Sequence, residues 1–282
     1  MKTRHTLVPL LCIILSALPA FAADKSKASS HASLTAQQIV DKNVAARGGL
    51  KAWHAVYSMR MTGKIDAGRL RTTPPVPLYA VTKTKYKIPK PAPEAKVVQL
   101  PFVMDLKRPN LMRFEMEFQG DTAVQAYDGA NGWKLRPFLG RHEVEPFTQE
   151  EMKQAEQQQQ LDGFLIDYAA KGTKVESDGM EKVNGHDAYK LKLTLKDGQV
   201  RHVWLDARTF LDVKIDGTRR MDGKPRQTAT YFRDYKTVKG LKIPFTMETS
   251  VEGVKDSEKI AIQQVEVNPK LADTQFARPD SK

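Results

Sequence analysis

Hydrophobic and polar residues alternate with a period of two along most of the chain after residue 55, a pattern typical of β-strands with one buried face. The clearest run is Leu111 to Phe118. Tyr189 to Lys196 and Arg201 to Leu205 flank Asp197-Gly198, which predicts a hairpin because this dipeptide accepts the positive φ of tight turns. The other segments predicted as strands are Val56 to Ile65, Phe102 to Leu106, Phe210 to Asp216, Thr228 to Tyr235, Pro244 to Val251 and Lys259 to Val267.

Two segments are predicted to be helices, because each begins with a threonine followed three residues later by Gln or Glu, the pattern of a capping box. Gly48-Gly49 end the first helix, and the second runs to about Leu161. The segment Phe164 to Tyr168 either extends the second helix or packs beneath it. The capping pairs are Thr35 with Gln38 and Thr148 with Glu151.

These elements predict a mainly β fold of the α+β class. Roughly ten or eleven short antiparallel strands with two helices favour an unclosed antiparallel β-barrel, or a strongly curved sheet, with the helices covering one face. The first strand is expected to end in a turn at residues 66–68. Residues 72–101 hold seven prolines, so we expect a loop insertion there, because proline cannot donate to a sheet ladder.

The N-terminus predicts a secretory signal peptide over residues 1–22. Lys2 and Arg4 precede an apolar run from Leu7 to Leu18, and small residues stand before Ala23. Cys12 permits the alternative of a lipid anchor, but it lies inside the apolar run, with bulky residues before it. We therefore expect cleavage near residues 22–23, a flexible segment over 23–33, a domain over 34–282, and a periplasmic location.

The net charge of the chain bears on which classes of partner the protein could bind. The formal net charge is +12, and Lys2 and Arg4 would leave with the signal peptide. An exported protein rarely meets nucleic acid, so we expect none as a partner; an anionic envelope surface, or simply a solvated basic surface, fits better. Cys12 is the one cysteine, so the mature chain would have no disulfide and no thiolate site. We expect a monomer.

Signals for catalysis are weak throughout the sequence. It has no nucleophile elbow, no phosphate-binding glycine loop and no paired-histidine metal motif. We therefore predict no enzyme, no cofactor and no metal. Three groupings of polar or aromatic residues leave other chemistry open: an acid and base pair, a carboxylate pair, and an aromatic platform for sugars. The acid and base pair would be His142 with Glu143, and the carboxylate pair would be Glu115 with Glu117 beside Arg113. The aromatic platform would consist of Trp53, Trp133 and Trp204.

Several turn motifs, taken in their order and spacing from about Leu34 to Pro279, carry a family resemblance. Together they resemble the LolA/LolB-type superfamily of periplasmic lipoprotein carriers, especially its outer-membrane lipoprotein-sorting branch. The motifs are Arg108-Pro109-Asn110 with Arg113, Tyr127-Asp128-Gly129 with Gly132-Trp133, Asp234-Tyr235 with Val238, Gly240-Leu241-Lys242-Ile243-Pro244, and Val265-Glu266-Val267-Asn268-Pro269 with Phe276 and Pro279.

The resemblance implies an unclosed barrel with a helical lid over an apolar cavity, and no catalytic residue. It implies a periplasmic carrier that shields acyl chains of lipoproteins or other envelope lipids, with membrane-bound donor and acceptor proteins. The alternative is an envelope-stress sensor or interaction module of the RseB kind; an unrecognised hydrolase is a third. The residues expected to line the cavity are Met59, Met61, Met104, Leu106, Met112, Phe114, Met116, Phe118, Leu191, Leu193 and Trp204.

Overall fold

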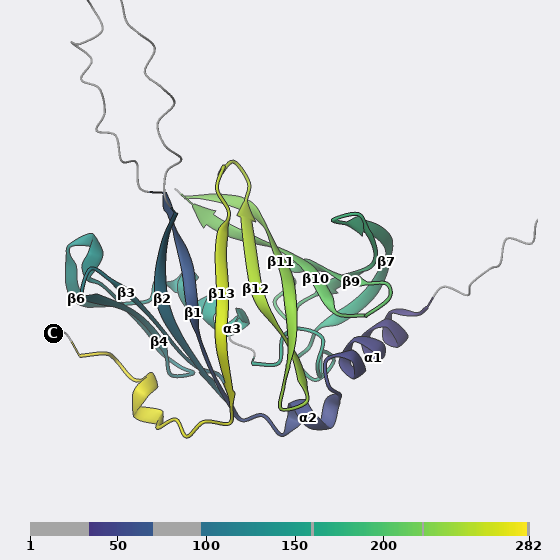
Figure 1. Cartoon of the computed structure of the whole chain (residues 1–282), viewed down its shortest axis with the longest axis horizontal. Helices are drawn as coiled ribbons and strands as arrows, with labels where there is room; N and C mark the ends of the chain where they lie inside the picture. Colours follow the sequence, from purple (N-terminus) through teal and green to yellow (C-terminus); the bar gives the residue numbers. More distant parts are fainter. Residues whose placement is uncertain (1–33, 70–96, 159–160, 222, 281–282) are drawn as a thin grey trace, which may run out of the picture. The chain divides into compact units, whose positions relative to one another are not determined.

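One antiparallel sheet organises the molecule (Figure 1). The computed structural model describes residues 34–69, 97–158, 161–221 and 223–280. In this part of the chain the sheet has 13 strands in the order β6-β5-β4-β3-β2-β1-β13-β12-β11-β10-β9-β8-β7. The two end strands, β6 and β7, do not pair with each other. The sheet is therefore not closed, and the predicted mainly β, half-barrel class is confirmed.

Strand β1 (Ser58–Arg69) pairs with β13 (Glu258–Val267), so the first and last strands of the domain lie side by side. Every other neighbouring pair in the sheet is consecutive in the sequence. The strands leading from β1 to one end are β2 (Val97–Lys107), β3 (Leu111–Phe118), β4 (Asp121–Tyr127), β5 (Gly132–Arg136) and β6 (Arg141–Pro146). Those leading from β13 to the other end are β12 (Leu241–Val251), β11 (Lys224–Val238), β10 (Asp212–Met221), β9 (Val200–Asp206), β8 (His186–Thr194) and β7 (Lys174–Val183).

The two predicted helices form where the capping boxes place them. Thr35 and Gln38 exchange hydrogen bonds at the start of α1 (Ala36–Ala46). Thr148 and Glu151 do the same at the start of α3 (Gln149–Gln158). A third short helix, α2 (Leu50–His54), was not predicted. The chain also has 3₁₀ turns at η2 (Pro137–Leu139) and η3 (Asp273–Phe276).

Some predicted boundaries are wrong. The structure has 13 strands in its described part where ten or eleven were predicted, and β1 continues to Arg69 through the expected turn at residues 66–68. The expected loop over 72–101 is also too long, because β2 begins at Val97 and Pro101 lies inside it, opposite Lys64. The pairing of β2 with β3 begins only at Phe102, so Pro101 has a partner strand on one side only, where a missing N–H is tolerated. The rest of the proline-rich segment and the predicted leader lie outside the described residues.

One face of the sheet, here called the inner face, holds two apolar clusters. The first lies between α3 and strands β1, β2, β3, β12 and β13, and includes Met59, Phe102 and Phe245. The second lies between α1 and strands β8 and β9, and includes Ile39 and Leu193. Val44 of α1 contacts both clusters. The helices thus cover the same face of the sheet from two sides.

A bulge at Gln263 in β13 helps to bend this sheet. The register between β1 and β13 shifts between Thr62 and Gly63. A methyl group at Gly63 would lie only 2.1 Å from the carbonyl oxygen of Ala261, so the two backbones approach there as only glycine permits. Bulges increase local twist and bend a strand, which fits the curved sheet seen in Figure 1.

Candidate ligand-binding face

The first apolar cluster contains most of the residues predicted to line a cavity. Met59, Met61, Leu106 and Met112 are buried in it, and Met104 and Phe114 pack against it while partly exposed. They share one face because strand pairing places Met61, Met104 and Phe114 opposite one another across β1, β2 and β3. The structure therefore brings these six side chains together on one face, and their role in lining a cavity stays a prediction.

Burial along this face is graded. Near the start of β1, residues such as Met59 and Leu106 are buried. Further along, Ile65 of β1, Ile260 of β13 and Met247 of β12 are neighbours on the same face but only partly buried. Met116, which pairs with the buried Phe102, is also partly exposed. The inner face thus presents partly exposed apolar side chains on β1, β3, β12 and β13.

The remaining predicted lining residues are not in the first cluster. Leu191 and Leu193 are fully buried in the second cluster, under α1. Phe118 is partly buried at the end of β3. Trp204 lies on the opposite face, because its neighbours Val203 and Leu205 on β9 point into the second cluster. There it is 4% exposed and packs with Val183 and Ala188, under the ammonium group of Lys214 at 4.0 Å from the ring centre.

Two contacts fix α3 on the inner face. Phe147, just before the helix, lies across β5 where Gly132 has no side chain; a methyl group there would lie 2.0 Å from Cδ2 of Phe147. Glu151 in the first turn receives the ammonium group of the buried Lys134 at 2.6 Å. Burial alone would raise the pKa of Glu151, but hydrogen bonds from Lys134 and Thr148 outweigh it and lower that pKa. The helix is therefore held by an ionised contact.

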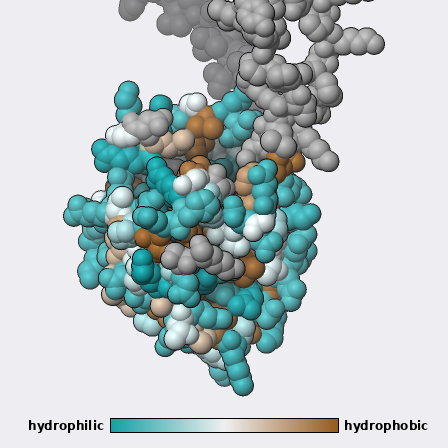
Figure 2. All heavy atoms as spheres, turned by 90° about the vertical axis from the view of Figure 1, so that its left-hand side faces the viewer, coloured by the Kyte–Doolittle hydropathy of each residue, from teal (hydrophilic) through white to brown (hydrophobic). Residues whose placement is uncertain are grey.

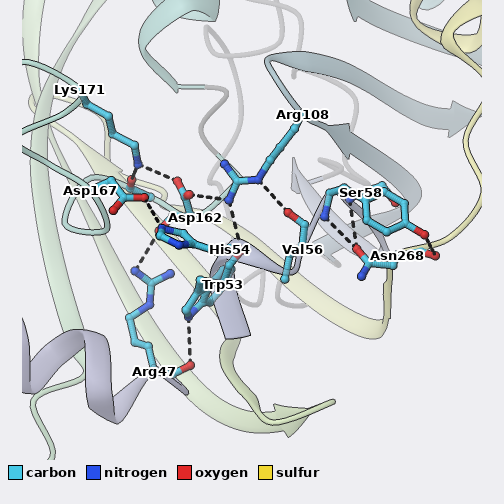
Figure 3. A network of polar contacts seen from close by, with 12 residues as sticks. Arg47, Trp53, His54, Val56, Ser58, Arg108, Asp162, Asp167, Lys171 and Asn268 are labelled. Atoms are coloured by element: carbon cyan, nitrogen blue, oxygen red, sulfur yellow. Dashed lines mark hydrogen bonds and ion pairs between the residues drawn. The ribbon is translucent and has the colours of Figure 1, made fainter. Parts of the chain in front are cut away.

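A buried polar network lies beside the first cluster (Figure 3). The Asp162 carboxylate accepts hydrogen bonds from Nζ of Lys171 at 2.6 Å and from Nη2 of Arg108 at 2.7 Å. Arg47 donates to the backbone oxygen of Asp162, and Arg108 also donates to Val56. The network thus ties the segment after α3 to α1, to the end of β2 and to the entry of β1.

Direct contacts with two cations determine the charge state of Asp162. Burial alone would raise the pKa of Asp162, but hydrogen bonds from Lys171 and Arg108 outweigh it and hold that pKa below its usual value. For Lys171, burial lowers the pKa and the contact with Asp162 offsets only part of that effect. Sequence reasoning did not predict this network; the one local signal is an aspartate, Asp162, between apolar residues Leu161 and Phe164.

The outer face of the sheet has a different character. A pocket of about 360 Å³ lies between β1, β2, β3 and the C-terminal segment. Four of its charged side chains form two ion pairs, Arg60 with Asp105 and Arg113 with Glu115. From the side shown in Figure 2, the surface is mostly hydrophilic with small separate apolar patches. The outer pocket is therefore lined mainly by charged and polar groups.

The alternative chemical groupings are dispersed or already paired. His142 and Glu143 are both exposed on β6. Glu115 forms an ion pair with Arg113 at 2.6 Å, as a charged stripe would. Trp53 lies in the first inner cluster and Trp204 on the outer face, so these two rings form no common platform. In the described part of the chain, no group of three or more His, Cys, Asp or Glu could hold a metal ion.

The described helices are also short. None of those in residues 34–69, 97–158, 161–221 and 223–280 is long and apolar enough to cross a bilayer.

Comparison with known proteins gives a fold but no close relative. No family model matches the chain, and no curated protein matches it. A crystal structure of a LolA superfamily protein from Nitrosomonas europaea superposes with a TM-score of 0.54, covering 87% of this chain and 99% of that one at 13% identity. The chain has a LolA-type fold.

Two further solved structures support the LolA-type fold. A DUF1329 family protein from Desulfovibrio piger gives a TM-score of 0.52 at 14% identity, covering 86% of this chain and 97% of that one. An outer membrane lipoprotein-sorting protein domain from Vibrio parahaemolyticus gives 0.50 at 14% identity, covering 84% and 94%. The similarity extends over nearly the full length of each, so the LolA-type sheet described here is the whole fold of those chains and not a fragment of it.

Proposed function

We propose that this protein binds acyl chains of lipoproteins or other envelope lipids on its inner face and shields them from water in the periplasm. The observation that carries the proposal is the partly exposed apolar surface formed by Ile65, Met104, Met116, Met247 and Ile260. Burying one methylene group contributes about 0.8 kcal/mol, so a chain of many methylenes gains much from such a surface. Methionine suits it because its flexible thioether adapts to different shapes.

The sequence and the fold together support the proposed location. The predicted signal peptide over residues 1–22 would export the chain, and a structure of the same fold is described as a lipoprotein-sorting domain. A carrier in that compartment would collect its cargo from a membrane-bound donor and release it to an acceptor. The protein would act as a binding protein without catalysis.

Displacement of a bound hydrophobic dye tests the proposal. We expect lipopeptide or fatty acid to displace the dye from the purified protein saturably, and mass spectrometry to detect lipids that co-purify with the protein from its native envelope. If no lipid co-purifies and nothing displaces the dye, the carrier proposal is wrong. That result would favour a sensor or interaction module, whose partner contacts need no lipid.

A pair of variants assigns the binding to the inner face. Met116→Gln makes a partly exposed inner residue polar and should weaken lipid affinity about fivefold, because part of the apolar contact is lost. Val103→Thr is the matched control: Val103 pairs with Glu115 and lines the outer pocket, so affinity should not change. Equal effects of both variants would place binding elsewhere.

A further inference from the structure

Arg201 lies on the inner face near the second apolar cluster. It pairs with Leu193 on β8, which is buried under α1, so both side chains point to that face. Its guanidinium lies over Gly217 of β10: a methyl group there would be 3.2 Å from Nη1 of Arg201 and 3.2 Å from Oγ1 of Thr228. The ring of Phe164 lies 5.3 Å from its guanidinium carbon. The arginine is thus placed between an aromatic ring and a strand that leaves room for it.

This arginine has no polar partner among the described residues. Its Nε is buried without a hydrogen bond, and no ion pair joins it to any residue that the structure describes. The two carboxylates that attract it are engaged elsewhere: Asp216 binds His202 at 2.7 Å, and Asp197 accepts the N–H of Gln199. Burial lowers the pKa of Arg201, against the pull of these carboxylates.

Most other partly buried arginines among the described residues are paired, with Arg226 on β11 as the exception. Arg60 makes two hydrogen bonds of 2.7 Å to Asp105, and Arg108 donates to Asp162. Buried donors in proteins are nearly always satisfied, and leaving one unpaired costs free energy. The position of Arg201 is therefore better suited to contact with a ligand than to a role in holding the fold together.

The surroundings of Arg201 indicate what kind of ligand would fit. Hydroxyl groups of Thr228, Thr230 and Thr249 lie on the same face, where Thr230 and Thr249 contact each other at 2.9 Å. The apolar side chains of Ile215 and Met247 flank them, and all five are partly exposed. A cation and hydroxyls beside apolar surface match a molecule with one anionic group and one apolar part.

We infer that the Arg201 guanidinium binds the acidic group, a carboxylate or phosphate, of an amphiphilic ligand whose chain lies along the inner face toward Met247. The planar fork of arginine matches both oxyanions with two parallel hydrogen bonds. The inference rests on the proposed lipid binding and adds to it a preference for anionic over neutral amphiphiles.

The test compares ligands with the same chain and different head groups. Dye displacement from the full protein would be measured with oleate, oleoyl lysophosphatidylglycerol, neutral monoolein and inorganic phosphate. Arg201→Gln should weaken the affinity for the two anionic lipids by about ten- to a hundredfold, the range expected for a charge-assisted hydrogen bond, and leave monoolein unchanged. Arg201→Lys should retain part of the anionic preference, because the positive charge remains while the two parallel hydrogen bonds of the guanidinium are lost. Arg208→Gln, the same change in an exposed turn, should have no effect.

Each outcome has a distinct meaning. Arg201→Gln should lower the melting temperature little, because among the described residues the native arginine has no hydrogen bond or ion pair to lose; a melting scan checks that the variant is folded. If Arg201→Gln weakens oleate and monoolein alike, or neither, the role of Arg201 is wrong while lipid binding stands. Saturable binding of inorganic phosphate that depends on Arg201 would show a site for a free anion, and would overturn the amphiphile. Failure of the wild type to bind any lipid would refute the proposed function itself, and the inference with it.

Discussion

Lys171 donates a hydrogen bond of 2.6 Å to Asp162, and both groups lie in the polar network beside the inner face. Asp162 is only 1% exposed, and its second carboxylate oxygen receives Arg108. Two cations thus meet one buried anion. Removing the aspartate would therefore take away the ion-pair partner of both cations at once.

Replacing Asp162 by asparagine should therefore destabilise the protein strongly. We expect Asp162→Asn to lower the free energy of unfolding by about 3 kcal/mol at neutral pH, since it removes the ion-pair partner of Lys171, whose side chain is only 19% exposed. The double variant Asp162→Asn/Lys171→Met should recover part of the loss. Urea unfolding measures both. Asp187→Asn, which breaks an exposed pair with Lys182, should cost less than about 1 kcal/mol; a similar cost for Asp162→Asn would contradict the role of the network.

The same carboxylate predicts a dependence on pH. The folded protein holds the pKa of Asp162 below its ordinary value of 3.8, so the unfolded chain takes up the proton first as the pH falls. The stabilising contribution is therefore complete above about pH 4 and is lost as the pH drops through the folded pKa. We expect the difference in unfolding free energy between wild type and Asp162→Asn to shrink between pH 7 and pH 2. A difference that stays constant over this range would mean that Asp162 does not titrate as the contacts require.

Features set by local sequence could be predicted. The capping boxes at Thr35 and Thr148 involve residues three positions apart, and both form. The alternation from Met112 to Phe118 needs only the period of a strand, and β3 has the predicted bounds. Local patterns sufficed for the fold class because a meandering antiparallel sheet is built mostly from consecutive strands.

Features set by distant contacts could not be predicted. Helix α2 is five residues long, too short to show a period, and is fixed through Trp53, whose Nε1 donates to Arg47. Strand β7 is mostly exposed, so it has no clear alternation. Arg201 falls in a predicted strand, but the surroundings of its side chain could not be read from that strand. The two residues beside its guanidinium, Gly217 and Phe164, come from other parts of the chain. Which charged side chains form pairs, and which are buried, depends on contacts between residues far apart in the sequence.

The close approach of β1 and β13 gives a final prediction. A methyl group at Gly63 would lie 2.1 Å from the backbone oxygen of Ala261, and backbone cannot yield as a side chain can. We expect Gly63→Ala to lower the free energy of unfolding by about 3 kcal/mol, since it forces apart the strands that join the two halves of the sheet. Gly217→Ala is the matched control in a strand, because its nearest neighbours are side-chain ends at 3.2 Å that can move, and it should cost about 1 kcal/mol or less. Urea unfolding of both variants decides the matter: equal costs would show that β1 and β13 can separate at the bulge without loss.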